Sequence, residues 1–477
     1  MGSGQVTSSV SPDFTGKHVT VAGLGVSGVP AAKVLHARGA IVTVVNDGDD
    51  ARAREQAAEL EKLGVTVRLG DGDTLPEGTE LIVTAPGWKP TKPLFRAAEQ
   101  AGVEVWGDVE LAWRLRGPDA APWLCVTGTN GKTTTVQMLA SILKAAGLRT
   151  AAVGNIGVSL LDAVLGEQTY DVLAVELSSY QLHWAPSLRA HSAAVLNLAP
   201  DHLDWHGSME AYARDKGRIY EGNRVACVYN VADKATEDLV READVEEGCR
   251  AIGFTLGTPG PSQLGVVEGI LVDRAFVENR HKNAQELAEV SDVNPPAPHN
   301  IANALAAAAL ARAFGVEPRA VRDGLRDFRP DAHRIAHVAD VAGVAYVDDS
   351  KATNTHAAEA SLAAYESIVW IAGGLAKGAT FDELVAKSAK RLRGAVLIGA
   401  DRALIREALA RHAPEVPVVD LDRTDTGAML QAVQEAQRLA EPGDTVLLAP
   451  ACASMDMFAN YNQRGDAFAQ AVSELGS

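Results

Sequence analysis

The sequence predicts an α/β protein of three domains, each with a largely parallel sheet covered by helices. The chain has 477 residues, which corresponds to about three domains at roughly 150 residues each. Short β-branched apolar segments alternate with helical segments, and this alternation is typical of parallel sheets. Two of the apolar segments run into glycine-rich turns that open a helix. Such turns place backbone N–H groups where they can hold an anion.

Two short proline-containing segments are interpreted as domain boundaries. They are Arg116–Pro122 and Arg329–Asp331. We therefore expect domains at residues 16–118, 119–330 and 331–477, preceded by a flexible tail at residues 1–15.

The first domain is predicted to be Rossmann-like. Its expected strands are residues 18–22, 41–45, 81–84 and 103–106. The turn Gly23–Gly28 has the pattern GxGxxG and leads into a helix expected at residues 29–38. Asp47 follows the second strand, as in dinucleotide-binding folds. A UDP-sugar carries the same pyrophosphate as NAD, so the pattern leaves both ligands open.

The central domain is predicted to be of the P-loop ATPase type, with a small antiparallel annex. Its expected strands are residues 123–127, 172–176, 193–198 and 224–229, and its expected helices are residues 133–146 and 301–314. Short strands with Gly and Pro turns at residues 251–277 indicate the annex. The third domain is expected to be a Rossmann-like α/β unit. Its expected strands are residues 345–347, 368–371, 395–398 and 445–448.

Composition excludes several classes of protein. Hydrophobic residues make up 47% and charged residues 22%, as in ordinary globular proteins. The net charge of −17 gives no general reason to bind nucleic acid or an anionic membrane. The four cysteines form no CxxC pair, which favours buried thiols in a reducing cytosol. No apolar segment is long enough to span a bilayer, and the first residues lack the order of a signal peptide, so we expect a cytoplasmic enzyme.

The strongest local motif is TGTNGKTT at residues 127–134. The glycines let backbone N–H groups converge on phosphate oxygens, and the next helix adds the positive end of its dipole. Lys132 can reach the β and γ phosphates, and the Thr133 hydroxyl can bind Mg²⁺. The usual P-loop pattern has glycine where Val126 stands, so this is a variant loop. The residues expected to bind nucleotide here are Gly128, Thr129, Asn130, Gly131, Lys132, Thr133 and Thr134.

Two further segments could supply metal ligands. Glu176 ends an apolar strand, and such an end faces the ligand crevice of an α/β sheet. His202 lies in Asp201-His202-Leu203-Asp204, just after another strand. Mg²⁺ prefers oxygen ligands of the kind that Glu176 offers. Taken alone, an exposed Glu176 is an equally acceptable interpretation, and a lone histidine such as His202 is more often structural.

These motifs, in this order, resemble those of the Mur ligases. The resemblance rests on TGTNGKTT, GNIG at 154–157, ELSSYQL at 176–182, DHLDWHG at 201–207, HR at 333–334, DDSKATN at 348–354, AGGLAKG at 372–378 and LLAPACASMDMFANYNQRGDAF at 447–468. It covers the chain beyond the tail. The last segment, the GxGxxG domain and the length are most similar to the member that joins D-glutamate to UDP-N-acetylmuramoyl-L-alanine.

The resemblance implies an ATP-dependent amide ligase of peptidoglycan precursor synthesis. ATP would activate a carboxylate as an acyl phosphate, which the amine of D-glutamate then attacks. The implied cofactors are ATP and two Mg²⁺ ions, and the implied partners are the two small substrates. A cytoplasmic monomer is expected.

The resemblance also implies roles for individual residues. Thr133 and Glu176 would bind one Mg²⁺, and Glu176, His202 and a carbamylated Lys216 would bind the second, while Lys132 holds the phosphates. Asn300 and Asn303 match residues at the adenine, and Arg334 and Asp349 match residues that reach the nucleotide. The expected D-glutamate residues are Lys351, Thr353, Lys377, Ser454 and Tyr461. The expected residues for the UDP-substrate are Gly25, Val26, Ser27, Asp47, Pro86, Gly87 and Asn155.

A few positions depart from the family pattern, and other functions stay open. Tyr461 stands where phenylalanine is common, Leu375 and Ala376 fill the GGxxKG motif, and Asn46-Asp47-Gly48 replaces the usual acid and hydroxyl. A sister Mur ligase or a folate polyglutamate synthetase would use a different amino acid or acceptor. An NAD-dependent oxidoreductase would explain only GxGxxG. A nucleotide-binding regulator would turn over no ATP.

Overall fold

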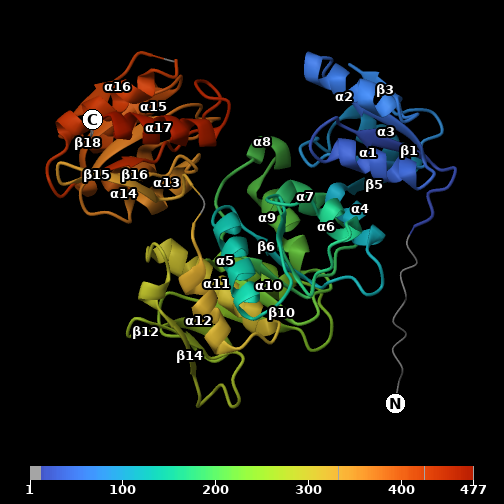
Figure 1. The fold of residues 1–477 in the computed structure, drawn as a ribbon, viewed down its shortest axis with the longest axis horizontal. Helices are drawn as coiled ribbons and strands as arrows, with labels where there is room; N and C mark the ends of the chain where they lie inside the picture. The colour runs from blue at the N-terminus through green and yellow to red at the C-terminus, as the bar shows by residue number, and fades with distance from the viewer. Residues whose placement is uncertain (1–11, 331, 424, 476–477) are drawn as a thin grey trace. The chain divides into compact units, whose positions relative to one another are not determined.

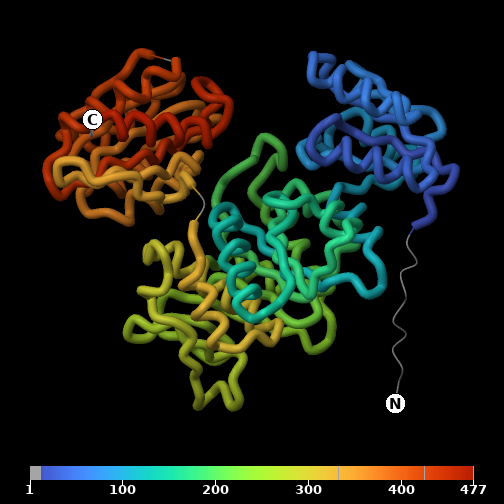
Figure 2. Tube along the Cα trace, in the orientation of Figure 1, coloured from blue at the N-terminus to red at the C-terminus, as the bar shows by residue number. Residues whose placement is uncertain are grey.

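The computed structural model describes residues 12–330, 332–423 and 425–475. The chain folds as two compact units. One contains the residues up to Val293 together with Ile301–Phe328, and the other contains Asn294–Asn300 and the chain from Arg329 onward. Each unit is described by itself. Figure 2 traces the chain through them from blue to red. The predicted boundaries at residues 118 and 330 stay predictions.

The first sheet has five parallel strands in the order β3-β2-β1-β4-β5. The strands are β1 (His18–Ala22), β2 (Ile41–Asn46), β3 (Thr66–Leu69), β4 (Leu81–Thr84) and β5 (Glu104–Gly107). The helices are α1 (Gly28–Ala37), α2 (Ala51–Glu61), α3 (Pro93–Ala101) and α4 (Asp108–Leu115). Val19 and Val21 of β1 pack with α1, whereas Ala22 packs with α3 on the other face. Strand side chains alternate between faces, so both faces are covered, as the Rossmann-like prediction requires.

The chain begins to pack earlier than predicted. Residues 1–11 of the predicted tail lie outside the described residues. Phe14, also assigned to the tail, is buried and meets Trp106 edge-on, with ring centroids 6.3 Å apart. Its large apolar side chain gains more from the core than from solvent, so residues 12–15 belong to the folded domain.

The central sheet has nine strands in the order β14-β13-β12-β11-β10-β9-β6-β8-β7. They are β6 (Trp123–Thr127), β7 (Ala152–Gly154), β8 (Leu173–Glu176), β9 (Ser192–Val195), β10 (Ala226–Asn230), β11 (Arg250–Phe254), β12 (Gln263–Val267), β13 (Ile270–Asp273) and β14 (Gln285–Glu289). The helices are α5 (Lys132–Ala145), α6 (Leu160–Leu165), α7 (Ser179–His183), α8 (Leu203–His206), α9 (Met209–Gly217), α10 (Lys234–Glu242), α11 (Pro298–Ala313) and α12 (Pro318–Asp327). Figure 1 shows α5, α11 and α12 within this region.

The annex differs in one respect from the prediction. The predicted annex begins at residue 251, but β11 pairs in parallel with β10 and so continues the parallel part of the central sheet. Only the β12–β13 and β13–β14 pairs are antiparallel. The tight turn at Gly269, with φ of 81°, reverses the chain between β12 and β13. Antiparallel pairing therefore begins at this short turn, since a tight turn can join only antiparallel neighbours.

The second unit has a six-stranded sheet in the order β15-β16-β20-β17-β18-β19. Its strands are β15 (Ala336–Val341), β16 (Val344–Asp348), β17 (Ile368–Gly373), β18 (Leu392–Ile398), β19 (Val418–Asp420) and β20 (Thr445–Leu448). Its helices are α13 (Thr355–Leu362), α14 (Asp382–Ser388), α15 (Arg402–His412), α16 (Ala428–Leu439) and α17 (Tyr461–Leu475). All pairs are parallel except β15–β16. This is the α/β unit that the sequence predicts.

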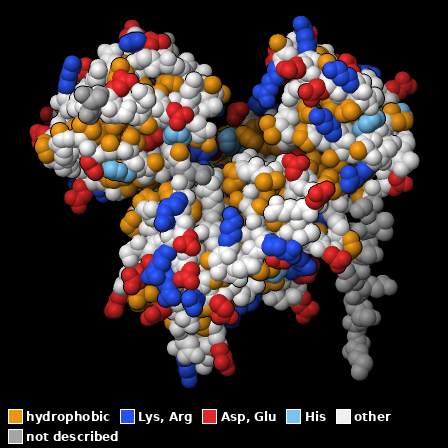
Figure 3. All heavy atoms as spheres, viewed as in Figure 1, with side chains coloured by type: hydrophobic (Ala, Val, Ile, Leu, Met, Phe, Trp, Pro, Cys, Tyr) orange, Lys and Arg blue, Asp and Glu red, His pale blue; other side chains and the backbone are white. Residues whose placement is uncertain are grey.

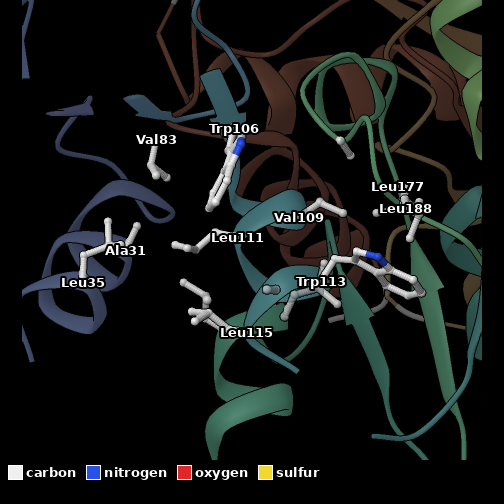
Figure 4. Close-up of a cluster of buried hydrophobic side chains, with 14 of the residues drawn as sticks. Ala31, Leu35, Val83, Trp106, Val109, Leu111, Trp113, Leu115, Leu177 and Leu188 are labelled. Atoms are coloured by element: carbon white, nitrogen blue, oxygen red, sulfur yellow. The ribbon is translucent and has the colours of Figure 1, made fainter. Parts of the chain in front are cut away.

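Helix α4 joins the first sheet to the central one. Its side chains pack in one continuous core with α1 and β4 on one side and with residues of the central domain, such as Leu177 and Leu188, on the other (Figure 4). Its fully buried Glu110 accepts hydrogen bonds from Arg114 Nε at 2.5 Å and from the backbone N–H of Ser187 at 3.0 Å. A buried carboxylate needs such partners, so α4 is held from both sides.

The surface carries mixed charge despite the net charge of −17. Figure 3 shows Lys and Arg side chains interspersed with Asp and Glu on the face in view. Among the residues that the structure describes, no helix combines the length and apolar composition needed to cross a bilayer. The four cysteines are free thiols, and Cys125, Cys227 and Cys452 are buried as predicted, whereas Cys249 is only partly buried.

We predict that Leu111→Ala destabilises the first unit. Leu111 is fully buried in the core that α4 shares, and such a truncation costs roughly 2–5 kcal/mol of the free energy of unfolding. Urea unfolding followed by tryptophan fluorescence measures it, because Trp370 is the one tryptophan beyond Arg329. Leu63→Ala is the control, since Leu63 is exposed. Equal unfolding midpoints for the two variants would contradict the shared core.

Candidate active site

The glycine-rich loop follows β6 at the carboxyl edge of the central sheet. The neighbouring strands β8 and β9 run parallel to β6 and end at the same edge, where Glu176 and the segment leading to His202 begin. The loop is pinned to the β9 segment. Asn130 N–H donates to Asn197 Oδ1 at 2.8 Å, and Asn197 Nδ2 donates back to the Asn130 carbonyl at 3.1 Å. Parallel topology thus gathers the predicted residues at one edge.

Two lysines meet at one carbonyl of this loop. Lys132 Nζ and Lys216 Nζ donate to the Gly128 oxygen at 2.9 and 2.8 Å. Lys216 lies near the end of α9 and is fully buried. Burial, and then the nearby Lys132 ammonium, lower the pKa of Lys216 well below its usual value. The structure therefore favours a neutral amine at Lys216 and a cluster that gains from added negative charge.

Glu176 presents a carboxylate oxygen that lacks a partner. Its Oε1 accepts a hydrogen bond from Asn155 Nδ2 at 2.9 Å. Its Oε2 is buried and, among the described residues, has no hydrogen-bond donor. The two residues come together because Gly154 (φ 103°) packs on the Glu176 backbone, where a Cβ would lie 2.2 Å from the carbonyl oxygen. An orphaned buried carboxylate oxygen fits a cation that is to be bound there.

His202 stands at the start of α8 in a left-handed backbone conformation, with φ of 54°. Its ring packs against Tyr180 at a centroid distance of 4.9 Å. Burial, and to a smaller extent the charge of Lys132, lower the pKa of His202, although Asp201 opposes the shift. The imidazole is thus held in the neutral form that can bind a metal. In the described ranges no three His, Cys, Asp or Glu side chains form a metal cluster.

A buried network that sequence analysis missed surrounds Lys216. Asp215 Oδ2 lies 2.9 Å from His183 Nδ1 and 3.0 Å from His206 Nδ1, and His206 Nε2 lies 2.9 Å from Ser179 Oγ. Although burial alone would raise it, the hydrogen bonds from the two histidines lower the pKa of Asp215 to about 2. The network ties α7, α8 and α9 together beside Lys216. No sequence motif pairs these residues, because they come from three separate segments.

The two predicted adenine residues lie at the start of α11. Asn303 abuts the phosphate loop, since a Cβ on Gly131 would lie 2.4 Å from Asn303 Oδ1. Asn300 lies one turn earlier, and its Nδ2 donates to the Pro295 carbonyl at 3.3 Å. The contact of Asn303 with the loop places it beside the predicted nucleotide site.

In the first sheet, the predicted residues for the UDP-substrate also follow parallel strands at one edge. Gly25, Val26 and Ser27 follow β1, Asp47 follows β2, and Pro86 and Gly87 follow β4, all at one carboxyl edge. Val26 is 81% exposed and open to a ligand. Ser27 Oγ donates to Asp108 Oδ2 at 2.9 Å, and burial raises the pKa of Asp108.

Asp47 is ion-paired in this structure. Lys92 Nζ lies 2.9 Å from Asp47 Oδ1 and 2.9 Å from Asp73 Oδ1. Sequence analysis missed Lys92 and Asp73. Because Lys92 is shared between the two carboxylates, Asp47 has a structural partner beside its predicted role toward the UDP-substrate.

In the second unit, three loops at the carboxyl edge of adjacent parallel strands carry the predicted D-glutamate residues. Lys351 and Thr353 follow β16, Ser454 follows β20, and Lys377 follows β17. Lys351 Nζ lies 3.9 Å from the ring centroid of Tyr461. The structure therefore brings Lys351 and Tyr461 into contact.

Close backbone packing joins two of these loops. Leu375 and Ala453 exchange backbone hydrogen bonds of 2.9 and 3.0 Å. A Cβ on Gly374 (φ 136°) would lie 2.2 Å from the Ala453 oxygen, so only glycine fits there. Lys377 and Ser454 follow this contact directly.

Arg464 is the buried anchor of this region, and sequence analysis missed it. Its guanidinium donates to Ser350 Oγ at 3.0 Å, to the Ser350 carbonyl at 2.8 Å and to the Cys452 carbonyl at 3.1 Å. Burial lowers the pKa of Arg464 to about 10. The side chain thus fixes the loops after β16 and β20 to each other. Its place in the motif NQRGD, within the segment at 447–468 that resembles the Mur ligases, was the available signal.

Asp349 and Arg334 lie together in the second unit. Burial raises the pKa of Asp349 to about 6, while a hydrogen bond from Ser361 and the charge of Arg334 oppose the shift. Because each unit is described by itself, their contact with the nucleotide stays a prediction.

Family models match three successive parts of the chain. "Mur ligase MurD-like, N-terminal domain" matches residues 17–107, "Mur ligase middle domain" matches residues 126–311, and "Mur ligase, glutamate ligase domain" matches residues 333–452. Together they cover most of the sequence. The chain belongs to the Mur ligase family.

Curated relatives of this Mur ligase share the name of one particular member of the family. A Streptomyces coelicolor protein named UDP-N-acetylmuramoylalanine–D-glutamate ligase is 91% identical over 468 residues, covering 98% of this chain and 99% of its own length. A Thermobifida fusca protein of the same name is 59% identical, covering 97% of this chain and 99% of its own length. The predicted family, three-domain fold and ligase class are confirmed.

Solved structures share the fold of this Mur ligase. The MurC ligase of Thermotoga maritima has a TM-score of 0.55 at 17% identity, covering 96% of this chain and 99% of its own. A MurF of Acinetobacter baumannii has a TM-score of 0.57 at 16% identity, covering 97% of this chain and 92% of its own. At these identities the likeness concerns the fold alone.

We predict that Asp215→Ala lowers the free energy of unfolding by roughly 1–3 kcal/mol, because it leaves the buried His206 without its Nδ1 partner. Urea unfolding of the variant against the wild type measures the loss. Arg214→Ala is the matched control, since Arg214 is the exposed neighbour on the same helix. If both variants unfold at the same midpoint, the network does not hold α9.

Proposed function

We propose that this Mur ligase joins D-glutamate to UDP-N-acetylmuramoyl-L-alanine at the expense of ATP, in cytoplasmic synthesis of peptidoglycan precursors. The 91% identity along nearly the whole length of a ligase of that name carries the proposal. The cluster of Lys132, Glu176 and Lys216 at one sheet edge supplies the matching chemistry. The enzyme acts as a monomer.

ATP binds along the loop that opens α5. The backbone N–H groups after Gly128 and the positive end of the α5 dipole face the phosphates. Lys132 Nζ donates to the Gly128 and Thr129 carbonyls at 2.9 Å and would bind the β and γ phosphates of ATP. Thr129, Asn130 and Thr134 line the loop, while Asn300 and Asn303 hold the adenine. Arg334 and Asp349, which the family pattern assigns to the nucleotide, would bind it as well.

Glu176 would hold Mg²⁺ through Oε2, which is the buried oxygen without a donor. Thr133 would complete one site, and His202 with Lys216 as its carbamate would complete a second. Bound Mg²⁺ neutralises phosphate charge and so favours phosphoryl transfer. Asn155 keeps the Glu176 carboxylate in place by its hydrogen bond to Oε1.

Lys216 becomes a ligand by reaction with CO₂. Its neutral amine attacks the carbon of CO₂, a C–N bond forms, and one proton leaves to solvent, so that the product is an anionic carbamate. The lowered pKa of Lys216 supplies the neutral amine. The carbamate also suits its surroundings, because it places an anion beside the Lys132 cation.

The N-terminal domain would hold the UDP-substrate, and the second unit would hold D-glutamate. Gly25, Val26 and Ser27 would hold the pyrophosphate of the UDP-substrate, with Asp47, Pro86 and Gly87 beside them. The substrate carboxylate takes the γ-phosphoryl group of ATP and becomes an acyl phosphate, and the amine of D-glutamate displaces phosphate to form the amide. D-glutamate has two carboxylates, which suit Lys351, Lys377, Thr353 and Ser454.

We predict that phosphate release from ATP depends strictly on D-glutamate. The assay contains Mg²⁺ and UDP-N-acetylmuramoyl-L-alanine, with one amino acid added at a time. A product heavier by one glutamyl residue, seen by mass spectrometry, identifies the reaction. Release with L-lysine or diaminopimelate in place of D-glutamate would assign a sister ligase, and no release with any amino acid would favour a nucleotide-binding regulator.

We predict that Lys216→Ala lowers this activity at least about 100-fold, as expected for loss of a metal-site group. Arg214→Ala, the exposed neighbour, keeps activity. Peptide mass spectrometry after methyl trapping would show Lys216 as its methyl carbamate in the wild type, heavier by one CO₂ and the trapping methyl group. Full activity of Lys216→Ala together with indifference to bicarbonate would refute the carbamate.

A further inference from the structure

A second concave site, away from the phosphate loop, lies on the central domain. Its volume is about 690 Å³, and Arg250, Phe276, Arg280, His281, Arg312 and Glu317 line it. Arg250 is the first residue of β11, whereas the phosphate loop follows the last residue of β6. Strands β6, β9, β10 and β11 pair in parallel. The pocket therefore lies at the sheet edge opposite the phosphate loop.

One of the three arginines in the pocket is already neutralised. Arg312 Nε lies 3.0 Å from Asp273 Oδ2, and this aspartate is fully buried. Its two terminal nitrogens donate to the carbonyls of Val316 and Phe276 at 2.6 and 3.1 Å. Arg312 therefore acts as a rigid wall of the pocket and carries no free charge into it.

The other two arginines form no ion pair within the described part of the chain, although the charge of the nearby Asp273 acts to raise the pKa of Arg250. Arg250 donates to the Ala275 carbonyl at 2.6 Å and lies 5.1 Å from the ring centroid of Phe276, but it pairs with no carboxylate among the described residues. The Arg280 side chain makes no hydrogen bond or ion pair within the described part of the chain. Burial, and then the charge of Arg280, lower the pKa of Arg250. Two like charges thus face one pocket in an acidic protein.

The loop that carries Arg280 is held in place. Arg274 donates to the Arg280 and His281 carbonyls at 3.3 and 3.1 Å, and Asn279 has a left-handed backbone conformation with φ of 52°. The two guanidiniums are therefore presented by fixed backbone. Glu317 at the rim adds one negative charge, so a ligand with more than one negative charge is favoured over a monoanion.

We propose that this pocket binds a diphosphate group, held by the guanidiniums of Arg250 and Arg280. Guanidinium forks match phosphate oxygens in pairs and stay charged. Phe276 offers an apolar surface to the rest of the ligand, and His281 lies at the rim as a further donor. The site is separate from the proposed ligase chemistry, because it lies at the other edge of the sheet.

Inorganic pyrophosphate is the probe. Calorimetric titration of the full chain without Mg²⁺ is expected to give two sites per chain in the wild type, one at the phosphate loop and one in the pocket. Lys132→Ala should remove the first site and leave the second. Arg280→Ala should remove the second, weakening that binding at least tenfold, while D-glutamate-dependent phosphate release persists.

The control is Lys282→Ala, which removes an exposed cation from the same loop outside the pocket. Equal weakening by Lys282→Ala and Arg280→Ala would mean diffuse attraction and would overturn the proposal. A wild-type titration with one site, abolished by Lys132→Ala, would overturn it as well. Arg280→Lys keeps the charge but loses the fork, so intermediate affinity is expected. Thermal unfolding of each variant checks folding, which Arg280→Ala should leave unchanged.

Discussion

The buried lysine beneath the phosphate loop is the constraint on which the rest of the central domain depends. A charged amine in such a place is costly unless it is paired, and the only hydrogen-bond acceptors found for Lys216 in the described chain are the Gly128 carbonyl and Thr127 Oγ1. The structure around Lys216 offsets this cost by holding the neighbouring segments firmly in place. Asp215 anchors the helix next to it, Asn130 and Asn197 lock the loop above it, and the sheet edge admits little movement. The site is thus preorganised to bind anions.

One topological rule positions chemistry in all three domains. Each sheet is mainly parallel, and in each the candidate residues follow strands that are neighbours in space but distant in sequence. Loops at such an edge can approach only where a side chain is absent, as Gly154 and Gly374 illustrate. Buried charged side chains then hold neighbouring segments together. Arg464 joins two loops in the second unit, and Asp215 joins three helices in the first.

The sequence predicted central strands and local motifs well, because both leave continuous signals. Strands β1, β4, β6 and β20 have the predicted bounds. The strands it missed, namely β3, β7, β14, β15 and β19, all lie at or next to a sheet edge, where one side faces solvent and the apolar run is short or broken. The phosphate loop was visible as eight consecutive residues. The contacts of His183 with Asp215 and of Lys92 with Asp47 were not, since only the tertiary fold brings such residues together.

Helix α4 has a consequence for how such enzymes exchange parts during evolution. The N-terminal family match stops at residue 107, one residue before this helix begins. Yet α4 is buried on both sides, and Glu110 is satisfied by a residue of the central domain. A recombination crossover between residue 107 and α4 would separate two halves of a single hydrophobic core. Chimaeras joined at that point would have mismatched core surfaces, so the first two domains should be inherited together. The unit beyond Arg329 has a hydrophobic core of its own and can be exchanged between proteins more easily.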